Sequence, residues 1–270
     1  GMFTAGAIDA LLDEEVRIPY TIGVSSGASY GCSYVSRQRG RNWEIVERFS
    51  ANPRYSGMRN FFTSSAIMDL VWVFDQIPNR LVPFDFETFY NTPERFVTGC
   101  SDFYSLKPLY YEKEAFDASG KLVMASCALP FYFPPIYYGG RRLVDGGLSD
   151  PIPLLHSEAE GNACNLVVLT KPKSYRHYLK PDERALTFYY SFISENAAGW
   201  IKIRPHVFNH VFKRCLEEDG NGKNVSLFIP EDLMISRFDR DLDKLKALYE
   251  AGYEGVLSRL DEIRDLARVN

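Results

Sequence analysis

The sequence lacks the cysteine and histidine spacings that are typical of metal sites and disulfide frameworks. It has 4 histidines and 5 cysteines in 270 residues, and no two cysteines are spaced as in C-x-x-C. An odd number of scattered cysteines indicates reduced thiols, as in a cytoplasmic protein. We therefore expect no structural metal. The cysteines are Cys32, Cys100, Cys127, Cys164 and Cys215.

An excess of one charge and a long apolar run are also lacking. The net charge of −4 gives no electrostatic reason to expect nucleic-acid binding. No charged segment followed by an apolar one opens the chain, so no secretory signal is indicated. The most apolar stretch, Ala66–Val82, is interrupted by Asp69, Asp75, Pro78 and Arg80, so we do not expect it to span a bilayer. These absences predict a soluble cytoplasmic protein that does not bind nucleic acid.

What the sequence does contain is a regular alternation of helix and strand patterns. Met2–Glu15 carries apolar residues on one helical face, and the apolar run Val16–Val24 is typical of a buried strand. Small residues recur from Ser26 onward and predict a helix that lies close against a sheet. A C-terminal helical pattern begins at Leu242 and is interrupted near Gly252–Gly255. The remaining expected strands are Arg95–Gly99, Lys121–Ser126, Arg141–Val144, Asn165–Thr170 and Val225–Ile229, and the remaining expected helices are Trp43–Phe49 and Ile201–Leu216.

This alternation predicts an α/β protein with a three-layer α/β/α sandwich around a mostly parallel central sheet. A change in composition near Lys171–Arg184, which is rich in Lys, Pro and Tyr, marks the one internal boundary that we expect. It divides the chain into residues 1–173 and a C-terminal extension, 174–270, in which helices are prominent. We expect this α/β extension to pack on the same domain.

The segment Thr21–Tyr34, TIGVSSGASYGCSY, contains the pattern G-x-S-x-G twice. The pattern is typical of a nucleophilic serine on a sharp turn between a strand and a helix. Ser25 directly follows the predicted strand, whereas Ser29 lies one turn inside the predicted helix. We therefore expect Ser25 to be the nucleophile, with Gly23 and Gly27 as its flanking glycines. By itself the pattern fits an ordinary glycine-rich junction equally well.

Two kinds of residue are candidates to accept the serine proton. A Ser-His-Asp esterase would use a histidine, but no histidine here lies in a short glycine-flanked loop after a clear strand. Asp145 ends a predicted strand, and Gly146 and Gly147 after it allow a sharp turn. Because strand ends converge at the functional edge of an α/β sheet, Asp145 is expected to meet Ser25 there. An aspartate in this context is also a common turn residue. The histidines are His156, His177, His206 and His210.

Several separated motifs, in the same order, resemble the patatin-like phospholipase family. Besides Gly23–Gly27 and Asp145–Gly147, the segment Ala125–Pro135 is similar to the A-S-x-A-x-P…F-P-P stretch that precedes the family's D-G-G strand. Gly1–Gly6 resembles the end of the family's opening glycine-rich stretch. The resemblance covers about Gly1–Lys173 and implies a patatin-like catalytic domain there. The remaining third is similar to the C-terminal region of a bacterial branch of the family.

The resemblance implies a serine lipid acyl hydrolase, a phospholipase A-like esterase that requires no metal or organic cofactor. In the implied Ser-Asp dyad, Ser25 is the nucleophile and Asp145 the general base. The backbone N–H groups of Gly1 and Ser26 would form the oxyanion hole. The implied substrate is a phospholipid or another fatty acyl ester. The alternatives are a non-catalytic patatin-like protein that binds lipids or other proteins, and a Ser-His-Asp esterase.

Two further features bear on these expectations. Asn60–Phe62 and Val71–Phe74 supply apolar surface for an acyl chain or for peripheral membrane contact, although most such residues simply pack helices onto sheets.

The sequence departs from the family at Asp150–Pro153, where the family often has Asn-x-Pro, and we expect only a local loop change. It also lacks the family's first strand and leading glycines before Gly1. We expect that adding such residues would raise stability and ester hydrolysis.

Overall fold

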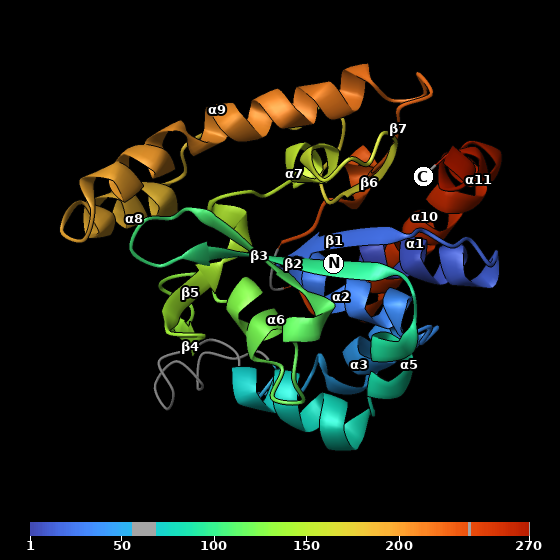
Figure 1. Cartoon of the computed structure of the whole chain (residues 1–270), viewed down its shortest axis with the longest axis horizontal. Coiled ribbons are helices and arrows are strands. Elements are labelled where there is room, and N and C mark those ends of the chain that lie inside the picture. The colour runs from blue at the N-terminus through green and yellow to red at the C-terminus, as the bar shows by residue number, and fades with distance from the viewer. Residues whose placement is uncertain (56–68, 237–238, 270) are drawn as a thin grey trace.

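The computed structural model describes residues 1–55, 69–236 and 239–269 (Figure 1). Within these residues, no helix has both the length and the apolar character needed to cross a membrane. The strands are β1 (Tyr20–Val24), β2 (Arg95–Asp102), β3 (Pro108–Glu112), β4 (Ile136–Tyr138), β5 (Arg141–Asp145), β6 (Asn165–Leu169) and β7 (Asn224–Phe228). The α-helices are α1 (Met2–Asp13), α2 (Ser26–Val35), α3 (Arg41–Phe49), α5 (Phe86–Asn91), α6 (Lys121–Ser126), α7 (Leu154–Ala159), α8 (Pro181–Ser191), α9 (Glu195–Glu217), α10 (Leu242–Leu257) and α11 (Leu260–Val269). The described residues also contain the π-helix η1 (Trp72–Leu81) and the short 3-10 segments η2 (Lys113–Ala115), η3 (Gly146–Leu148) and η4 (Glu231–Leu233).

The central sheet is mixed, not mostly parallel as the sequence predicts. Its strand order is β1-β2-β5-β4, and β3 also pairs with β2. Among the described residues, β1 and β2 are parallel, whereas the pairs β2–β3, β2–β5 and β4–β5 are antiparallel. A tight turn explains the last pair, because Gly139 and Gly140 both have positive φ between β4 and β5, as two-residue hairpins require. The α/β class is confirmed, and the three-layer arrangement stays a prediction.

Strand β2 brings the carboxyl ends of β1 and β5 together. β1 runs parallel along one edge of β2, and its last residue, Val24, pairs with Gly99. β3 occupies the opposite edge, so β5 continues along the edge of β1 in the antiparallel direction. The last residue of β5, Asp145, pairs with Cys100. The two strands therefore end head to head, one residue apart along β2.

The segment Lys121–Ser126, expected as a strand, is helix α6. Gly120 begins the helix in a left-handed conformation, with φ of 63°. Leu122 and Ala125 are three residues apart and both enter the small core formed with Cys100 and Leu143. A short apolar run can form either element, and the Leu, Met and Ala of this segment favour a helix. The other strands and helices expected from the sequence are present, with shifted ends.

The C-terminal part packs on the beginning of the chain. Helix α10 lies against α1 (Figure 1), and the two backbones approach closely where both helices carry glycine. A Cβ atom on Gly252 would lie 1.9 Å from the carbonyl oxygen of Phe3, and one on Gly6 would lie 1.8 Å from that of Tyr249. The break expected near Gly252–Gly255 is displaced: α10 continues through both glycines, and the helical tail is interrupted at Ser258–Arg259, before α11. At Gly252 the missing side chain permits the close helix crossing.

Candidate active site

Ser25 occupies a strained turn between β1 and α2. Its φ is 54° and its ψ is −124°, a conformation that non-glycine residues rarely adopt and that often marks functional sites. Gly23 permits the turn, because a Cβ there would lie 2.5 Å from the carbonyl oxygen of Gly27. The Ser25 N–H donates to Ser126 Oγ at 2.8 Å, and Ser126 Oγ donates to the carbonyl oxygen of Gly99 at 2.7 Å. Helix α6 thus fixes the serine turn to β2.

The Ser25 hydroxyl donates a hydrogen bond to the carboxylate of Asp145. The distance from Ser25 Oγ to Asp145 Oδ2 is 2.8 Å, and Asp145 is buried. The other carboxylate oxygen, Oδ1, accepts the N–H of Gly147 at 2.8 Å. Gly146 is required between them, because a Cβ there would lie 2.2 Å from the carbonyl oxygen of Gly99. The turn after Asp145 therefore orients one oxygen and leaves the other directed at the serine.

Two side chains of α9 hold this turn from the C-terminal part of the chain. Arg204 Nε donates to the carbonyl oxygen of Gly147 at 2.8 Å, and Trp200 Nε1 donates to that of Leu148 at 2.9 Å. They are four residues apart and so lie on one face of the helix. The sequence analysis missed both, since no motif identifies them and the spacing alone predicts only a shared helix face.

Arg204 is in turn held by a buried acid. Arg204 Nη1 forms an ion pair with Glu183 of α8, and His177 Nε2 lies 2.9 Å from the same carboxylate. Burial alone would raise the pKa of Glu183, but hydrogen bonds from His177 and from the Lys180 N–H, together with the charge of Arg204, hold that pKa below its usual value. Glu183 therefore stays ionised and fixes the orientation of Arg204.

The other histidines occupy different surroundings. The ring of His156 stacks on Tyr110, with centroids 3.5 Å apart. Tyr110 also donates to Asp150 Oδ2 at 2.6 Å, within the segment Asp150–Pro153 that departs from the family pattern. His206 and His210 are exposed on α9. Within the described residues, no group of three or more His, Cys, Asp or Glu side chains is arranged to hold a metal ion.

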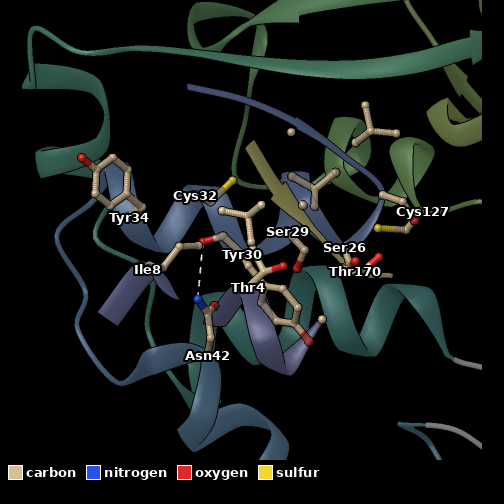
Figure 2. Close-up of a pocket in the computed structure, with 18 of the residues that line it drawn as sticks. Thr4, Ile8, Ser26, Ser29, Tyr30, Cys32, Tyr34, Asn42, Cys127 and Thr170 are labelled. Atoms are coloured by element: carbon tan, nitrogen blue, oxygen red, sulfur yellow. Dashed lines mark hydrogen bonds between the residues drawn. The ribbon is translucent and has the colours of Figure 1, made fainter. Parts of the chain in front are cut away.

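A cavity of about 830 Å³ adjoins the Ser25–Asp145 pair. Its size is within the range of ligand sites. Residues of β1 and β6 both line it, and Figure 2 shows Ser26, Ser29, Cys127 and Thr170 around it. Burial, and then the charge of Asp145, raise the pKa of the Cys127 thiol well above its usual range, so this thiol is protonated. Gly1 lines the same cavity.

Two apolar segments, Asn60–Phe62 and Val71–Phe74, are expected from the sequence to form an acyl-chain or membrane surface. Val73 and Phe74 line the cavity, whereas Trp72 is buried and packs edge-on against Phe49. Asn60–Phe62 lie outside the described residues. Among the described residues of this expected surface, Val73 and Phe74 therefore face the site.

The serine turn and the turn after Asp145 fall within one family match. The family model described as patatin-like phospholipase matches residues 1–156. The chain belongs to the patatin-like phospholipase family. A second model, described as a domain of unknown function, DUF6363, matches residues 198–268. In this patatin-like protein, the two α9 side chains that hold the Asp145 turn thus come from a region that a different family model matches.

One curated relative extends the comparison beyond the patatin match. The uncharacterized protein YjjU of Escherichia coli (strain K12) is 25% identical over 183 residues, which cover 64% of this chain and 49% of the relative. The patatin-like chain thus spans about half the length of this relative. The likeness is consistent with the family but names no substrate.

Proposed function

We propose that this patatin-like protein is a serine lipid acyl hydrolase that cleaves fatty acyl esters through a Ser25–Asp145 dyad. The observation that carries the proposal is the 2.8 Å hydrogen bond from Ser25 Oγ to Asp145 Oδ2, beside a cavity of ligand size. Membership of a family described as patatin-like phospholipases supports the lipid substrate.

The dyad performs acyl transfer to water in two steps. Asp145 accepts the proton of Ser25 while the hydroxyl oxygen attacks the ester carbonyl, and the leaving alcohol takes that proton when the C–O bond breaks. Water then attacks the acyl-serine, Asp145 accepts the proton of the water, and Ser25 regains a proton as the fatty acid leaves. An aspartate with a solution pKa of about 3.9 is a weak base, so the close positioning of the two groups must supply much of the rate.

Backbone donors would stabilise the oxyanion in this mechanism. The Ser25 N–H is donated to Ser126 Oγ, so the donors that we propose are the N–H of Ser26, at the start of α2, and the main-chain nitrogen of Gly1, which precedes α1. The first N–H groups of a helix have no partner within the helix and favour negative charge. Losing one such donor typically costs about 10²–10³ in rate.

The contacts of the histidines support a dyad over a Ser-His-Asp triad. His177 is bonded to Glu183, and His156 is stacked on Tyr110, whereas Asp145 receives the Ser25 hydroxyl directly. The division of the chain into a catalytic part, 1–173, and an extension, 174–270, remains part of the proposal. Contact with a lipid surface is also part of it.

Covalent labelling by a fluorophosphonate tests the nucleophile. Wild type and Ser29→Ala should be labelled and should hydrolyse a soluble short-chain acyl ester, whereas Ser25→Ala should do neither. Ser29 is the matched control because it lines the same cavity in the second G-x-S-x-G copy. Asp145→Asn should lose turnover about as completely as Ser25→Ala, because groups that act as a unit are not additive. An unlabelled wild-type protein would favour the non-catalytic lipid-binding alternative.

A further inference from the structure

Four aromatic side chains form an exposed cluster on α8 and the loop beside it. Phe188, Tyr189, Phe192 and Phe131 are 68%, 41%, 76% and 47% exposed, respectively, and we call them the aromatic patch. The rings of Phe188 and Phe192 meet edge to face with centroids 5.0 Å apart, and those of Phe131 and Tyr189 lie 5.7 Å apart. The patch thus joins two segments that are distant in the sequence. Figure 1 shows α8 and the beginning of α9 at one end of the molecule.

Helix α8 packs on the protein through another face. Leu186 and Tyr190 lie opposite Phe188 and Phe192 on the helix and are buried with Val144 and Leu148, on either side of the Asp145 turn. A helix needs only one apolar face to pack in a globular protein. Large apolar side chains gathered on the other face indicate a surface that contacts something else.

Phe131 connects the patch to the cavity beside Ser25. Its φ is 68°, which is rare for a bulky residue and marks a backbone held in place by its surroundings. Its neighbours Leu129, Tyr132 and Phe133 line the cavity, whereas Phe131 itself is exposed and touches Tyr189. One loop therefore contributes both to the wall of the site and to the patch.

The exposed charges of residues 180–202 have both signs. Three exposed side chains there are basic and two are acidic; they are Lys180, Arg184, Lys202, Asp182 and Glu195. The remaining acid of this segment, Glu183, is buried and paired with Arg204. The segment therefore offers no strong field of one sign to a highly charged partner. Neighbouring exposed phenylalanine and tyrosine side chains are instead suited to the boundary between water and lipid, where an apolar ring is buried and a hydroxyl stays wet.

We propose that the aromatic patch binds the surface of a phospholipid bilayer and brings the cavity beside Ser25 to its substrate. The inference rests on the proposed function for the nature of the substrate, but the binding itself does not require turnover. Because the exposed charges of residues 180–202 have both signs, binding should occur on zwitterionic phosphatidylcholine and should persist at high salt. Insertion of the rings is the source of the affinity.

Co-sedimentation with phosphatidylcholine vesicles tests the patch. Full burial of one such side chain corresponds to tenfold or more in a partition constant, so Phe188→Ser/Phe192→Ser should lower vesicle binding at least about tenfold. The control variant Leu155→Ser/Leu242→Ser removes two exposed apolar side chains of α7 and α10 and should bind like wild type. Hydrolysis of a soluble short-chain ester by the patch variant should stay within twofold of wild type, while its hydrolysis of vesicle lipid falls.

The outcomes separate this inference from the proposed function. Equal vesicle binding by the patch and control variants would overturn the inference, whatever the activity. A wild-type dimer that the patch variant converts to a monomer would overturn it too, because a second copy would then cover the patch. Vesicle binding that depends on the patch, in a protein without esterase activity, would support the inference and refute the proposed function alone.

Discussion

Replacing Arg204 by alanine tests how the C-terminal part controls the catalytic turn. Arg204 donates to the Gly147 carbonyl oxygen at 2.8 Å, and the N–H of Gly147 donates to Asp145 Oδ1 at 2.8 Å. Arg204 acts on the carboxylate through the Gly147 peptide in these contacts, so we treat it as a positioning residue. Its loss should loosen the turn and displace the carboxylate from Ser25.

The structure sets the size of the expected effects. A hydrogen bond to a charged group contributes about 1.5–3 kcal/mol, and removing one member of a buried ion pair costs about 3–5 kcal/mol. The side chains of Arg204 and Glu183 are 16% and 11% exposed, so we expect Arg204→Ala to lower the free energy of unfolding by about 3 kcal/mol. A displacement of about 1 Å in a catalytic group can cost about 10² in rate, and we expect that loss in kcat with little change in KM.

Arg214→Ala is the matched control. Arg214 lies on the same helix and pairs with Glu158 and Glu218, but all three side chains are more exposed, and the loss should be about 1 kcal/mol. Trp200→Phe removes the N–H that reaches Leu148 but keeps an aromatic ring in the same cluster, and it should give a smaller loss of kcat than Arg204→Ala.

Three measurements compare these variants. They are urea unfolding, kcat and KM on a soluble acyl ester, and hydrogen exchange of the peptide that covers residues 146–150. Faster exchange in Arg204→Ala but not in Arg214→Ala would support the positioning role even without turnover. Equal exchange and equal kcat in the two alanine variants would refute it, and full recovery in Arg204→Lys would show that charge suffices.

Three other predictions concern the turns and the buried acid. Gly146→Ala should destabilise the fold and abolish hydrolysis, because its Cβ would lie 2.2 Å from the Gly99 carbonyl oxygen. Gly27→Ala is the control: a Cβ there would have no atom within 4 Å, so this variant should unfold at the wild-type temperature or above. Similar melting temperatures for the two variants would contradict this account of the Asp145 turn. Ser25→Gly should be about 1 kcal/mol more stable than Ser25→Ala, because glycine relieves the strain at φ of 54°, and urea unfolding of both variants measures this. The pKa of Glu183 is lowered in the folded state, so ionised Glu183 contributes its full stability above its usual pKa of 4.5. That contribution is lost as the pH falls through the lower pKa of the folded state. Glu183→Gln should therefore reduce the decrease in unfolding free energy at acid pH, and a decrease equal to that of wild type would count against the ion pair.

Much of the candidate site could be predicted from local sequence. The strand, serine and small-residue helix around Ser25 are contiguous, so their order alone indicates a strained turn. The glycines after Asp145 similarly indicate a sharp turn at a strand end. A signal that the sequence analysis left unused is Gly139-Gly140, whose two glycines predict the β4–β5 hairpin and thereby an antiparallel β5. That hairpin is what makes the sheet mixed.

Other errors arose where local pattern and tertiary contact disagree. The apolar run of α6 is too short for its periodicity to distinguish a helix from a strand. In the folded protein, Leu122 and Ala125 lie on one face of the helix and pack with Cys100 and Leu143. Gly252–Gly255 suggested a break in the C-terminal helix, since glycine has a low helix propensity, but the break lies at Ser258–Arg259. Gly252 is needed inside α10 because the Phe3 backbone lies too close to leave room for a side chain. No sequence pattern shows which segment will pack against this position.

By itself the sequence determined the two turns, because each depends on neighbouring residues whose conformational preferences act locally. Their meeting was decided only in the tertiary structure. Val24 and Asp145 are brought together because they pair with adjacent residues of β2, Gly99 and Cys100, and pairing register depends on the whole sheet. The hydrogen bonds from α9 to the Asp145 turn likewise depend on the tertiary structure. They join residues 52 and 57 positions apart, and they form only when the C-terminal helices pack on the sheet.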